Sequence, residues 1–314
     1  MSDMPRELHH LVGSVAGEFT VGEHAWGGPG GTRGWEVKGF DGRRWFARRH
    51  AEAESFDREV TAYRRWTGYL GEGHAAELAA ADAETGAIVL TALPGRPLSI
   101  RKPAPEEERE AYRQAGALLA RLHSAPVGAT AGTGASEGAG AAGPAANAGA
   151  GPEATWAADV EEMLNGAALY LAREDEELLR AIAEEPPPSL PGVPTHSDYQ
   201  PRNWLWDERQ QLLRLIGFER TCVEPAARRD LAGLEYGLLQ TGSGLRSAFY
   251  EGYGRELTDA ERRACVSYAA VEALIALRRG IEHRDIESVE RAHSMLAALR
   301  AERAEQRVWG GCAS

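Results

Sequence analysis

The segment THSDYQPRNWLW, residues 195–206, places residue types that can carry chemistry at a fixed spacing. Asp198 and Asn203 stand five residues apart, with Pro201 between them. In phosphoryl transfer, an aspartate accepts or orients the attacking hydroxyl and an asparagine holds a Mg²⁺ on the phosphates. The proline would stiffen the turn and help the two side chains converge. The pattern alone also occurs by accident, so its meaning depends on the surrounding elements.

The sequence on either side of this segment indicates that it is a loop. The preceding stretch EEPPPSLPGVP has five prolines and cannot be helical. After the segment begins, WLWD and LLRLIGF predict two short strands joined by the turn ERQQ. The pattern therefore lies on a loop that leads into a small hairpin. Loops held by a rigid scaffold often carry catalytic groups.

The N-terminal part of the chain predicts an antiparallel sheet and one helix. Residues 15–50 have the pattern of strands, and the pair Asp41-Gly42 between two such runs is a strong hairpin signal. The segment AESFDREVTAYRRWTGYL then carries apolar residues at helical spacing. A short apolar strand, AIVLTAL, precedes a Pro-Gly turn that would suit a hinge between two lobes.

Helical patterns dominate the rest of the chain. Helices are predicted from Glu106, over 155–184, and from about 230 to 307. Residues 127–154 interrupt them with almost nothing but small residues, which bury too little apolar area to offset the entropy of ordering. We expect this stretch to be a flexible surface insertion without chemistry.

Composition excludes several classes of protein. The net charge is −12 and no block of lysine and arginine exceeds three residues, so nucleic acid is a poor partner. Nothing at the N-terminus joins a basic segment to an apolar one, and no run of about 18 apolar residues occurs, so we expect neither a signal peptide nor a membrane span. Cys222, Cys265 and Cys312 are too few and too scattered for a disulfide framework or a zinc site. We expect a soluble cytoplasmic protein that binds neither nucleic acid nor membrane.

The run from His196 to Asn203 resembles the His-x-Asp-x-x-x-x-Asn catalytic loop of the aminoglycoside phosphotransferase family, the small-molecule relatives of protein kinases. The order of predicted elements is similar to that family over most of the chain. The resemblance implies an α+β, protein-kinase-like fold with two lobes. Residues 1–94 would form the nucleotide-binding lobe, and 95–314 a larger, mostly helical lobe that carries the catalytic loop.

The resemblance also implies roles for residues around the loop. Asp198 would act as the catalytic base and Asn203 as a ligand of Mg²⁺. His196 would brace the loop through hydrogen bonds. Asp230, in ARRDLAGL, matches the aspartate that ties the catalytic loop down in this family. A plainer role for Asp230 is the N-cap of the helix that follows, and the two roles are compatible.

The first lobe would hold ATP or GTP. In the family, a lysine on the third strand reaches the phosphates and is fixed by a glutamate of the next helix. Glu59 stands at the glutamate position, but Arg48 replaces the lysine. Arginine keeps the charge, yet its planar fork is not equivalent to an ammonium group. Gly30 and Gly31, in WGGPGGTRG, occupy the place of the loop over the phosphates, where a hairpin turn without a ligand is the alternative.

The main departure from the family follows the catalytic loop. Relatives carry an Ile-Asp-Phe motif whose aspartate binds the metal, whereas this chain has Gly217 at that position. Glycine has no side chain with which to bind Mg²⁺. If the strand persists, Glu219 lies on the same face and would reach the metal directly or through water. This substitution, with that at Arg48, leaves normal turnover an open question.

Three functions therefore fit the sequence. The first is a phosphotransferase that moves the γ-phosphate of ATP or GTP to a hydroxyl of a small molecule. The second is a pseudokinase that binds a metabolite or a protein partner, and the third is a kinase-like enzyme that acts on Ser or Thr of a peptide. The acidic segments EEEREAY and REDEEL, with Glu224, would offer a pocket for a polycationic acceptor, or would simply form solvated helix faces.

Overall fold

The computed structural model describes residues 4–25, 34–101, 103–127, 152–240 and 244–310. The chain forms two compact units. The first comprises Met1–Gly132, Val193–Val223 and Ser247–Gly254, and the second comprises Thr133–Gly192, Glu224–Arg246 and Arg255–Ser314. The division into lobes at residue 94 stays a prediction. Gly30, Gly31, Cys312 and residues 128–151 of the expected insertion lie outside the described residues.

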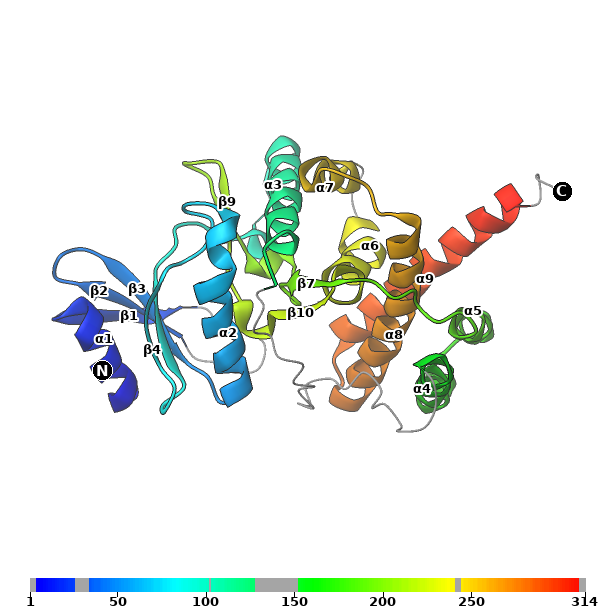
Figure 1. Cartoon of the computed structure of the whole chain (residues 1–314), viewed down its shortest axis with the longest axis horizontal. Coiled ribbons are helices and arrows are strands. Elements are labelled where there is room, and N and C mark those ends of the chain that lie inside the picture. The colour runs from blue at the N-terminus through cyan, green and yellow to red at the C-terminus, as the bar shows by residue number, and fades with distance from the viewer. Residues whose placement is uncertain (1–3, 26–33, 102, 128–151, 241–243, 311–314) are drawn as a thin grey trace. The chain divides into compact units, whose positions relative to one another are not determined.

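The first unit contains the predicted antiparallel sheet (Figure 1). Its strand order is β1-β2-β3-β5-β4, with β1 (Phe19–Ala25), β2 (Gly34–Gly39), β3 (Arg44–Arg49), β4 (Leu78–Asp82) and β5 (Ala87–Thr91). The hairpin expected at Asp41-Gly42 is confirmed, because β2 pairs with β3 across this turn. Gly42 has φ of 83°, a left-handed conformation that glycine adopts without steric cost.

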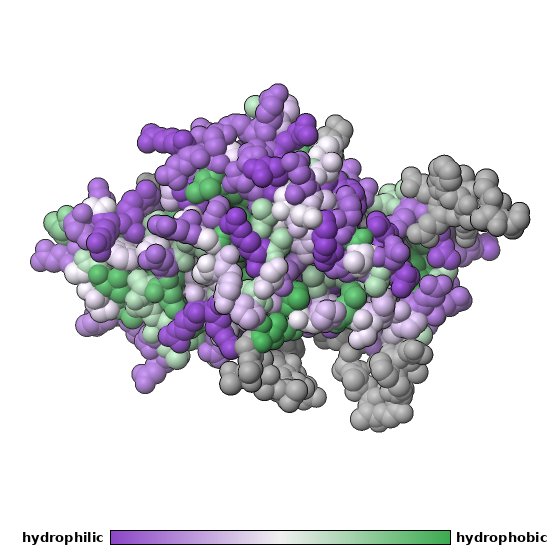
Figure 2. Space-filling model, turned by 45° about the horizontal axis from the view of Figure 1, so that its top comes forward, coloured by the Kyte–Doolittle hydropathy of each residue, from purple (hydrophilic) through white to green (hydrophobic). Residues whose placement is uncertain are grey.

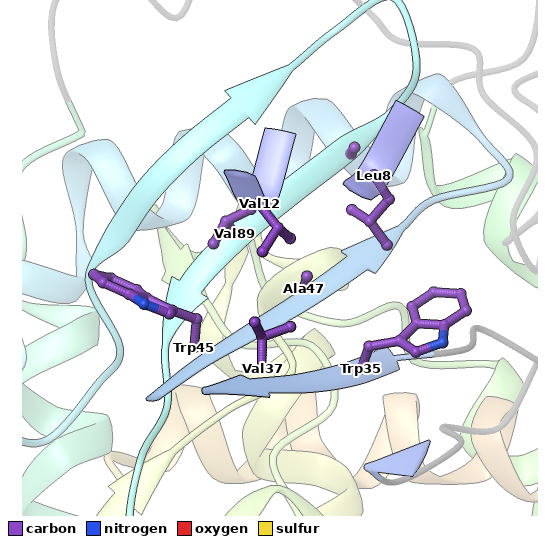
Figure 3. Close-up of a cluster of buried hydrophobic side chains, with 8 residues drawn as sticks. Leu8, Val12, Trp35, Val37, Trp45, Ala47 and Val89 are labelled. Atoms are coloured by element: carbon purple, nitrogen blue, oxygen red, sulfur yellow. The ribbon is translucent and has the colours of Figure 1, made fainter. Parts of the chain in front are cut away.

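Two helices flank this sheet, although the sequence patterns indicated one. Helix α1 (Arg6–Ala16) packs Leu8 and Val12 onto the sheet, where they meet Trp35, Val37 and Trp45 (Figure 3). Each large apolar side chain buried in this way contributes roughly 1.5–3 kcal/mol. Helix α2 (Ala53–Arg65), the predicted helix, lies on the opposite side of the sheet from α1 (Figure 1).

The alternation of side chains along β3 determines what each face of the sheet carries. Trp45 and Ala47 belong to the core beneath α1. Phe46 and Arg48 therefore point to the other face, because successive side chains of a strand alternate. The functional side chain of β3 is thus held by a strand whose opposite face is firmly packed.

The rest of the first unit builds the loop with the catalytic pattern. Strands β6 (Arg96–Pro97), β8 (Trp204–Asp207) and β9 (Leu212–Leu215) form a three-stranded sheet, which confirms the predicted hairpin. Strand β7 (Gly192–Thr195) pairs with β10 (Cys222–Pro225). Helix α3 (Pro105–His123) buries Tyr112 against Trp204, with ring centroids 5.3 Å apart. The aromatic run after the catalytic pattern is therefore core.

Helix α7 (Leu245–Tyr253) approaches α3 closely. A Cβ atom on Gly116 would lie 1.9 Å from the carbonyl oxygen of Phe249, and one on Gly252 would lie 1.7 Å from that of Arg113. Both distances are to backbone atoms, which cannot move aside as a side-chain end can. The two backbones therefore touch only because both positions are glycine.

The second unit is helical, as expected. Its helices are α4 (Pro152–Ala167), α5 (Arg173–Ala183), α6 (Ala232–Tyr236), α8 (Asp259–His283) and α9 (Ile286–Gly310). Helix α8 begins with a capping box in which Thr258 and Glu261 satisfy each other's backbone amides. Asp230 is buried inside the helical turn Ala227–Leu231, so its expected position as an N-cap is wrong.

The surface is mixed in character. On the face shown in Figure 2, hydrophilic side chains predominate and hydrophobic ones gather in small separate groups. Within the described residues, no helix combines the length and the apolar character that crossing a membrane requires. The cytoplasmic location and the absence of a nucleic acid partner stay predictions.

Candidate active site

A cleft of about 340 Å³ lies within the first unit. Residues from β3, α2, the segment after β5 and the loop that follows β7 line it. Part of its wall is apolar, formed by Phe46, Ala76, Leu90, Leu93, Leu205 and Ile216. The charged part includes Arg48, Glu59, Asp198, Arg202 and Glu219, with Asn203 beside them. The structure thus brings five of the predicted site residues to one cleft.

The loop that carries Asp198 is anchored from below by His196, which is fully buried. The Nε2 atom of His196 donates to the carbonyl oxygen of Ile216 at 3.0 Å. Its ring also packs on Tyr199 and Phe218, with centroids 5.4 and 4.9 Å away. These contacts link the catalytic pattern to the segment around Gly217, as a bracing role requires.

The backbone is strained just before Asp198. Ser197 has φ of 62°, which is uncommon for a residue with a side chain and costs on the order of 1–3 kcal/mol. Hydrogen bonding offsets part of this cost, because the Ser197 and Thr195 hydroxyls lie 2.9 Å apart. The turn that follows is a short 3-10 helix, Pro201–Asn203, which brings Asn203 back toward Asp198. Pro201 begins that turn, as the sequence pattern suggested.

Three side chains donate hydrogen bonds to the Asp198 carboxylate. Gln200 and Arg202 both reach Oδ1 at 2.5 Å, and the Nδ2 atom of Asn203 reaches Oδ2 at 2.9 Å. Burial opposes ionisation of this carboxyl, but the charge of Arg202 and these bonds outweigh it and lower the pKa of Asp198. Asp198 is therefore ionised at neutral pH, with both oxygens engaged.

Gly217 lies directly against Asn203. Its φ and ψ are 83° and 48°, in the left-handed region, and a Cβ atom there would lie 2.8 Å from Asn203 Oδ1. A side chain at position 217 would therefore point at the amide oxygen that the sequence pattern assigns to the metal. The chain continues as a 3-10 turn, Phe218–Arg220, so the expected continuation of the strand to Glu219 is wrong.

Arg48 and two glutamates form a buried charged group that we call the Arg48 triad, consisting of Arg48, Glu59 and Glu219. Arg48 forms an ion pair with Glu59 and donates to Glu219 Oε2 at 2.9 Å. Glu59 is fully buried, and its Oε2 lies 2.7 Å from Nε2 of His50. Burial of Arg48 favours its neutral form, but Glu59 and Glu219 outweigh this effect and raise the pKa of Arg48. The triad is held together by charge.

Glu219 is therefore engaged with Arg48 rather than free for a metal. Burial raises its pKa, yet the pairing with Arg48 dominates and lowers the pKa of Glu219 overall. Arg58 also holds this residue, by donating to its backbone carbonyl at 3.2 Å. Glu219 is thus an ionised carboxylate at neutral pH, as a metal ligand must be.

A Mg²⁺ ion on nucleotide phosphates needs only one or two protein ligands, because phosphates and water supply the rest. Asn203 Oδ1 and the Glu219 carboxylate are both hard oxygen donors that line the same cleft. They fit such an ion on one condition, that Glu219 leaves Arg48. Within the described residues, no group of three or more His, Cys, Asp or Glu side chains is placed to hold a metal alone.

Some predicted residues lie elsewhere, and some contacts were missed. Asp230 belongs to the second unit, so its tie to the catalytic loop stays a prediction. Arg202 lies within the sequence pattern, but the pattern did not predict its ion pair with Asp198. His50 follows β3 on the same face as Arg48, and strand alternation would have identified it.

An antiparallel sheet, a buried pair between a strand cation and a helix glutamate, and a His-x-Asp-x-x-x-x-Asn loop are typical of kinase-like phosphotransferases, although the cation there is lysine and here is Arg48. Residues 30–266 match the sequence model described as the phosphotransferase enzyme family, and the chain belongs to that family. No curated protein sequence matches the chain significantly. The family match thus covers most of the chain, and it does not identify the molecule that accepts the phosphate.

Three solved structures illustrate the likeness. Macrolide 2'-phosphotransferase MphH from Brachybacterium faecium has 16% identity and a TM-score of 0.57, with 93% of this chain and 98% of that chain covered. The GDP complex of aminoglycoside 2'-phosphotransferase-IIIa has 13% identity and a TM-score of 0.65, covering 95% and 100%. Spectinomycin phosphotransferase APH(9)-Ia, with ADP and spectinomycin, has 12% identity and a TM-score of 0.58, covering 96% and 95%. At sequence identities this low, the three structures confirm only the fold, which is the expected α+β, protein-kinase-like one.

Proposed function

We propose that this protein transfers the γ-phosphate of ATP or GTP to a hydroxyl group of a small molecule. The observation that carries the proposal is the placement of an ionised Asp198, held by Asn203, in the same cleft as the Arg48 triad. The cleft thus offers a group that can orient a hydroxyl, and also a cation held by a buried glutamate, as a phosphate site requires.

The apolar part of the cleft is suited to a nucleotide base. Phe46, Leu90 and Leu205 line it beside the segment that follows β5. Arg48 would contact the phosphates, with Glu59 fixing its direction. Asn203 and Glu219 would hold Mg²⁺, which neutralises charge on the phosphates when bound. The GDP and ADP in the titles of two similar structures support nucleotide use by this fold.

Asp198 would act on the acceptor. An ionised carboxylate in this position orients the hydroxyl and accepts its proton as the bond to phosphorus forms. His196 and the strained Ser197 determine where the carboxylate lies. Transfer is favoured by this positioning more than by basicity, because the pKa of Asp198 is lowered.

A second candidate is a pseudokinase that binds a ligand without turnover. Gly217 favours it, because the position beside Asn203 lacks a side chain that could hold a metal. The closed Arg48–Glu219 pair favours it too, since both groups already satisfy each other. Retention of Asp198, Asn203 and Glu59 in one cleft favours the enzyme.

Titration calorimetry with ATP and GTP, in Mg²⁺ or in EDTA, tests the proposal. We expect binding that Mg²⁺ strengthens, and phosphate transfer to at least one compound in a panel of hydroxyl acceptors. Arg48→Ala should weaken binding at least about tenfold, roughly the loss of one charged contact of 1.4 kcal/mol. Arg49→Ala is the matched control, because the Arg49 side chain lies on the opposite face of β3 and bonds Thr85.

Each result points to one candidate. Absence of nucleotide binding in both conditions would refute the phosphotransferase and leave a protein that uses the fold for another ligand. Binding without transfer, equal in wild type and Asp198→Ala, would favour the pseudokinase.

A further inference from the structure

Arg202 is a charged residue that lines the cleft and has no role in the function proposed above. Its side chain is about one third exposed and lines the cleft beside Asp198. It donates to Asp198 Oδ1 at 2.5 Å and also bonds the side-chain oxygen of Gln200. Its Nε atom is buried and has no hydrogen-bond partner among the described residues. The guanidinium therefore has unused donor capacity next to the group that would hold the acceptor.

The other arginines that line the cleft are matched by glutamates. Arg44 pairs with Glu36, and Arg48 pairs with Glu59 and Glu219. Arg202 differs, because Asp198 is the one carboxylate that it contacts among the residues that the structure describes. In the proposed reaction, that carboxylate must turn to an incoming hydroxyl.

Oδ1 of Asp198 accepts two hydrogen bonds and Oδ2 accepts one, so a hydroxyl either takes the remaining acceptor position on Oδ2 or displaces a donor. In both cases Arg202 loses the one anionic partner that it has among the described residues, either by displacement or when Asp198 accepts the hydroxyl proton in the proposed reaction. An anionic group on the acceptor would replace that partner while the hydroxyl binds Asp198. A neutral acceptor would leave Arg202 unpaired, and a cationic one would be repelled.

We propose that the acceptor carries a carboxylate or another oxyanion near its reactive hydroxyl, and that Arg202 binds this group. The proposal rests on the proposed function, since it assigns the substrate class of that site. It sets this chain apart from the polycationic acceptors that the acidic segments suggested. Arg202 would then determine acceptor specificity, because it exchanges the Asp198 carboxylate for the oxyanion of the acceptor.

The γ-phosphate of the nucleotide is the other source of an oxyanion in this cleft. Arg48 lies on the strand that would face the phosphates, whereas Arg202 is bonded to the residue that would hold the acceptor. We therefore assign Arg202 to the acceptor. The experiment below separates the two sources by measuring both ligands on the same variant.

D-Glycerate and glycerol are matched probes, because they are similar in size and differ mainly in one carboxylate. Each compound is titrated into the full-length protein in two states, without nucleotide and saturated with Mg²⁺ and a non-hydrolysable ATP analogue. Sodium acetate is the control for ionic strength and for a carboxylate without a hydroxyl. Binding is followed by calorimetry and thermal shift. We expect glycerate to bind at least about tenfold more tightly than glycerol or acetate, the difference that one charged contact supplies.

Arg202→Gln should abolish this preference, and Arg202→Lys should keep part of it, because a lysine retains the charge without the fork. Arg209→Gln is the control, since Arg209 is exposed on the β8–β9 turn and does not line the cleft. The glycerate preference should persist in that variant. Unchanged affinity of Arg202→Gln for the ATP analogue shows that the variant is folded and that Arg202 does not serve the nucleotide.

Equal responses to glycerate and glycerol in the wild type, including no response to either, would overturn the proposal. So would a glycerate preference that survives Arg202→Gln, or a loss confined to the ATP analogue. If the wild type fails to bind the analogue at all, the proposed function fails. The nucleotide-free titrations still decide whether Arg202 binds an oxyanion.

Discussion

Replacement of Gly217 by aspartate should strengthen binding of Mg²⁺ and nucleotide while it weakens the free protein. The left-handed conformation at position 217 costs a residue with a side chain about 1–2 kcal/mol, and aspartate tolerates it better than most. A Cβ atom would also lie 2.8 Å from Asn203 Oδ1, so the Asn203 amide must shift by a few tenths of an ångström. The contact is to the end of a side chain, which can shift, but the shift weakens the hydrogen bonds that Asn203 Nδ2 donates to Asp198.

The gain comes from a carboxylate placed beside Asn203, where the ion would bind. Mg²⁺ on nucleotide phosphates prefers one or two carboxylate ligands, and the wild type must take its one carboxylate, Glu219, from Arg48. Gly217→Asp supplies a ligand without breaking that pair. We expect affinity for ATP with Mg²⁺ to rise roughly tenfold or more, about 1.4 kcal/mol, with no rise in EDTA.

Gly217→Ala is the matched control, because it carries the same Cβ contact and at least as much backbone strain, without a ligand. Thermal unfolding without ligand should show both variants less stable than the wild type. Calorimetry with ATP and Mg²⁺ should then separate them, with alanine at or below the wild type. Equal affinity of the aspartate and alanine variants would refute the idea that position 217 faces the ion.

Three further predictions concern single side chains. Asp198→Ala should abolish any phosphate transfer found in the wild type, measured as product formation at saturating nucleotide, while nucleotide affinity stays unchanged. Burial raises the pKa of Glu272 to about 7, so stability present below its ordinary value of 4.5 is lost as pH rises toward 7. Glu272→Gln should therefore raise the free energy of unfolding at pH 8 by up to about 3 kcal/mol, measured by denaturation, and change it little at pH 4. Burial opposes ionisation of Glu261, but Arg255 and Thr258 lower its pKa to about 2. Glu261→Gln should therefore lower the free energy of unfolding by about 1 kcal/mol above pH 5. The difference from the wild type should disappear as the pH falls from 4.5 to 2.

The features that the sequence predicted well are local ones. The Asp41-Gly42 hairpin depends on two turn residues, and the His196–Asn203 loop on a spacing within eight residues. The family resemblance implied that Glu59 would hold the residue at the lysine position, and in the structure Glu59 forms an ion pair with Arg48.

Features that depend on distant contacts were missed. The Arg48–Glu219 pair joins residues 171 positions apart, and neither residue type indicates the other. The sequence predicted a strand over LLRLIGF, residues 212–218, but β9 ends at Leu215, and Gly217 adopts a left-handed conformation that leads into a 3-10 turn. Local propensity cannot show such a change, because it depends on the buried ring of Phe218 packing against His196 and Tyr63.

The charge balance of the cleft determines how the proposed ligands would bind. Without ligands, Arg48 pairs with both Glu59 and Glu219, and Arg202 pairs with Asp198. Nucleotide phosphates that take Arg48 from Glu219 would leave the Glu219 carboxylate without its ion pair, and a Mg²⁺ ion that takes Glu219 would leave Arg48 paired with Glu59 alone. Either ligand alone breaks the Arg48–Glu219 ion pair and forms one new pair, whereas the two ligands together replace it with two new pairs. Mg²⁺ and nucleotide should therefore bind cooperatively, and by linkage each should raise the affinity for the other by the same factor. An oxyanion on the acceptor would act in the same way at the Arg202–Asp198 pair. Ligands of the correct charge would thus bind more tightly together than separately.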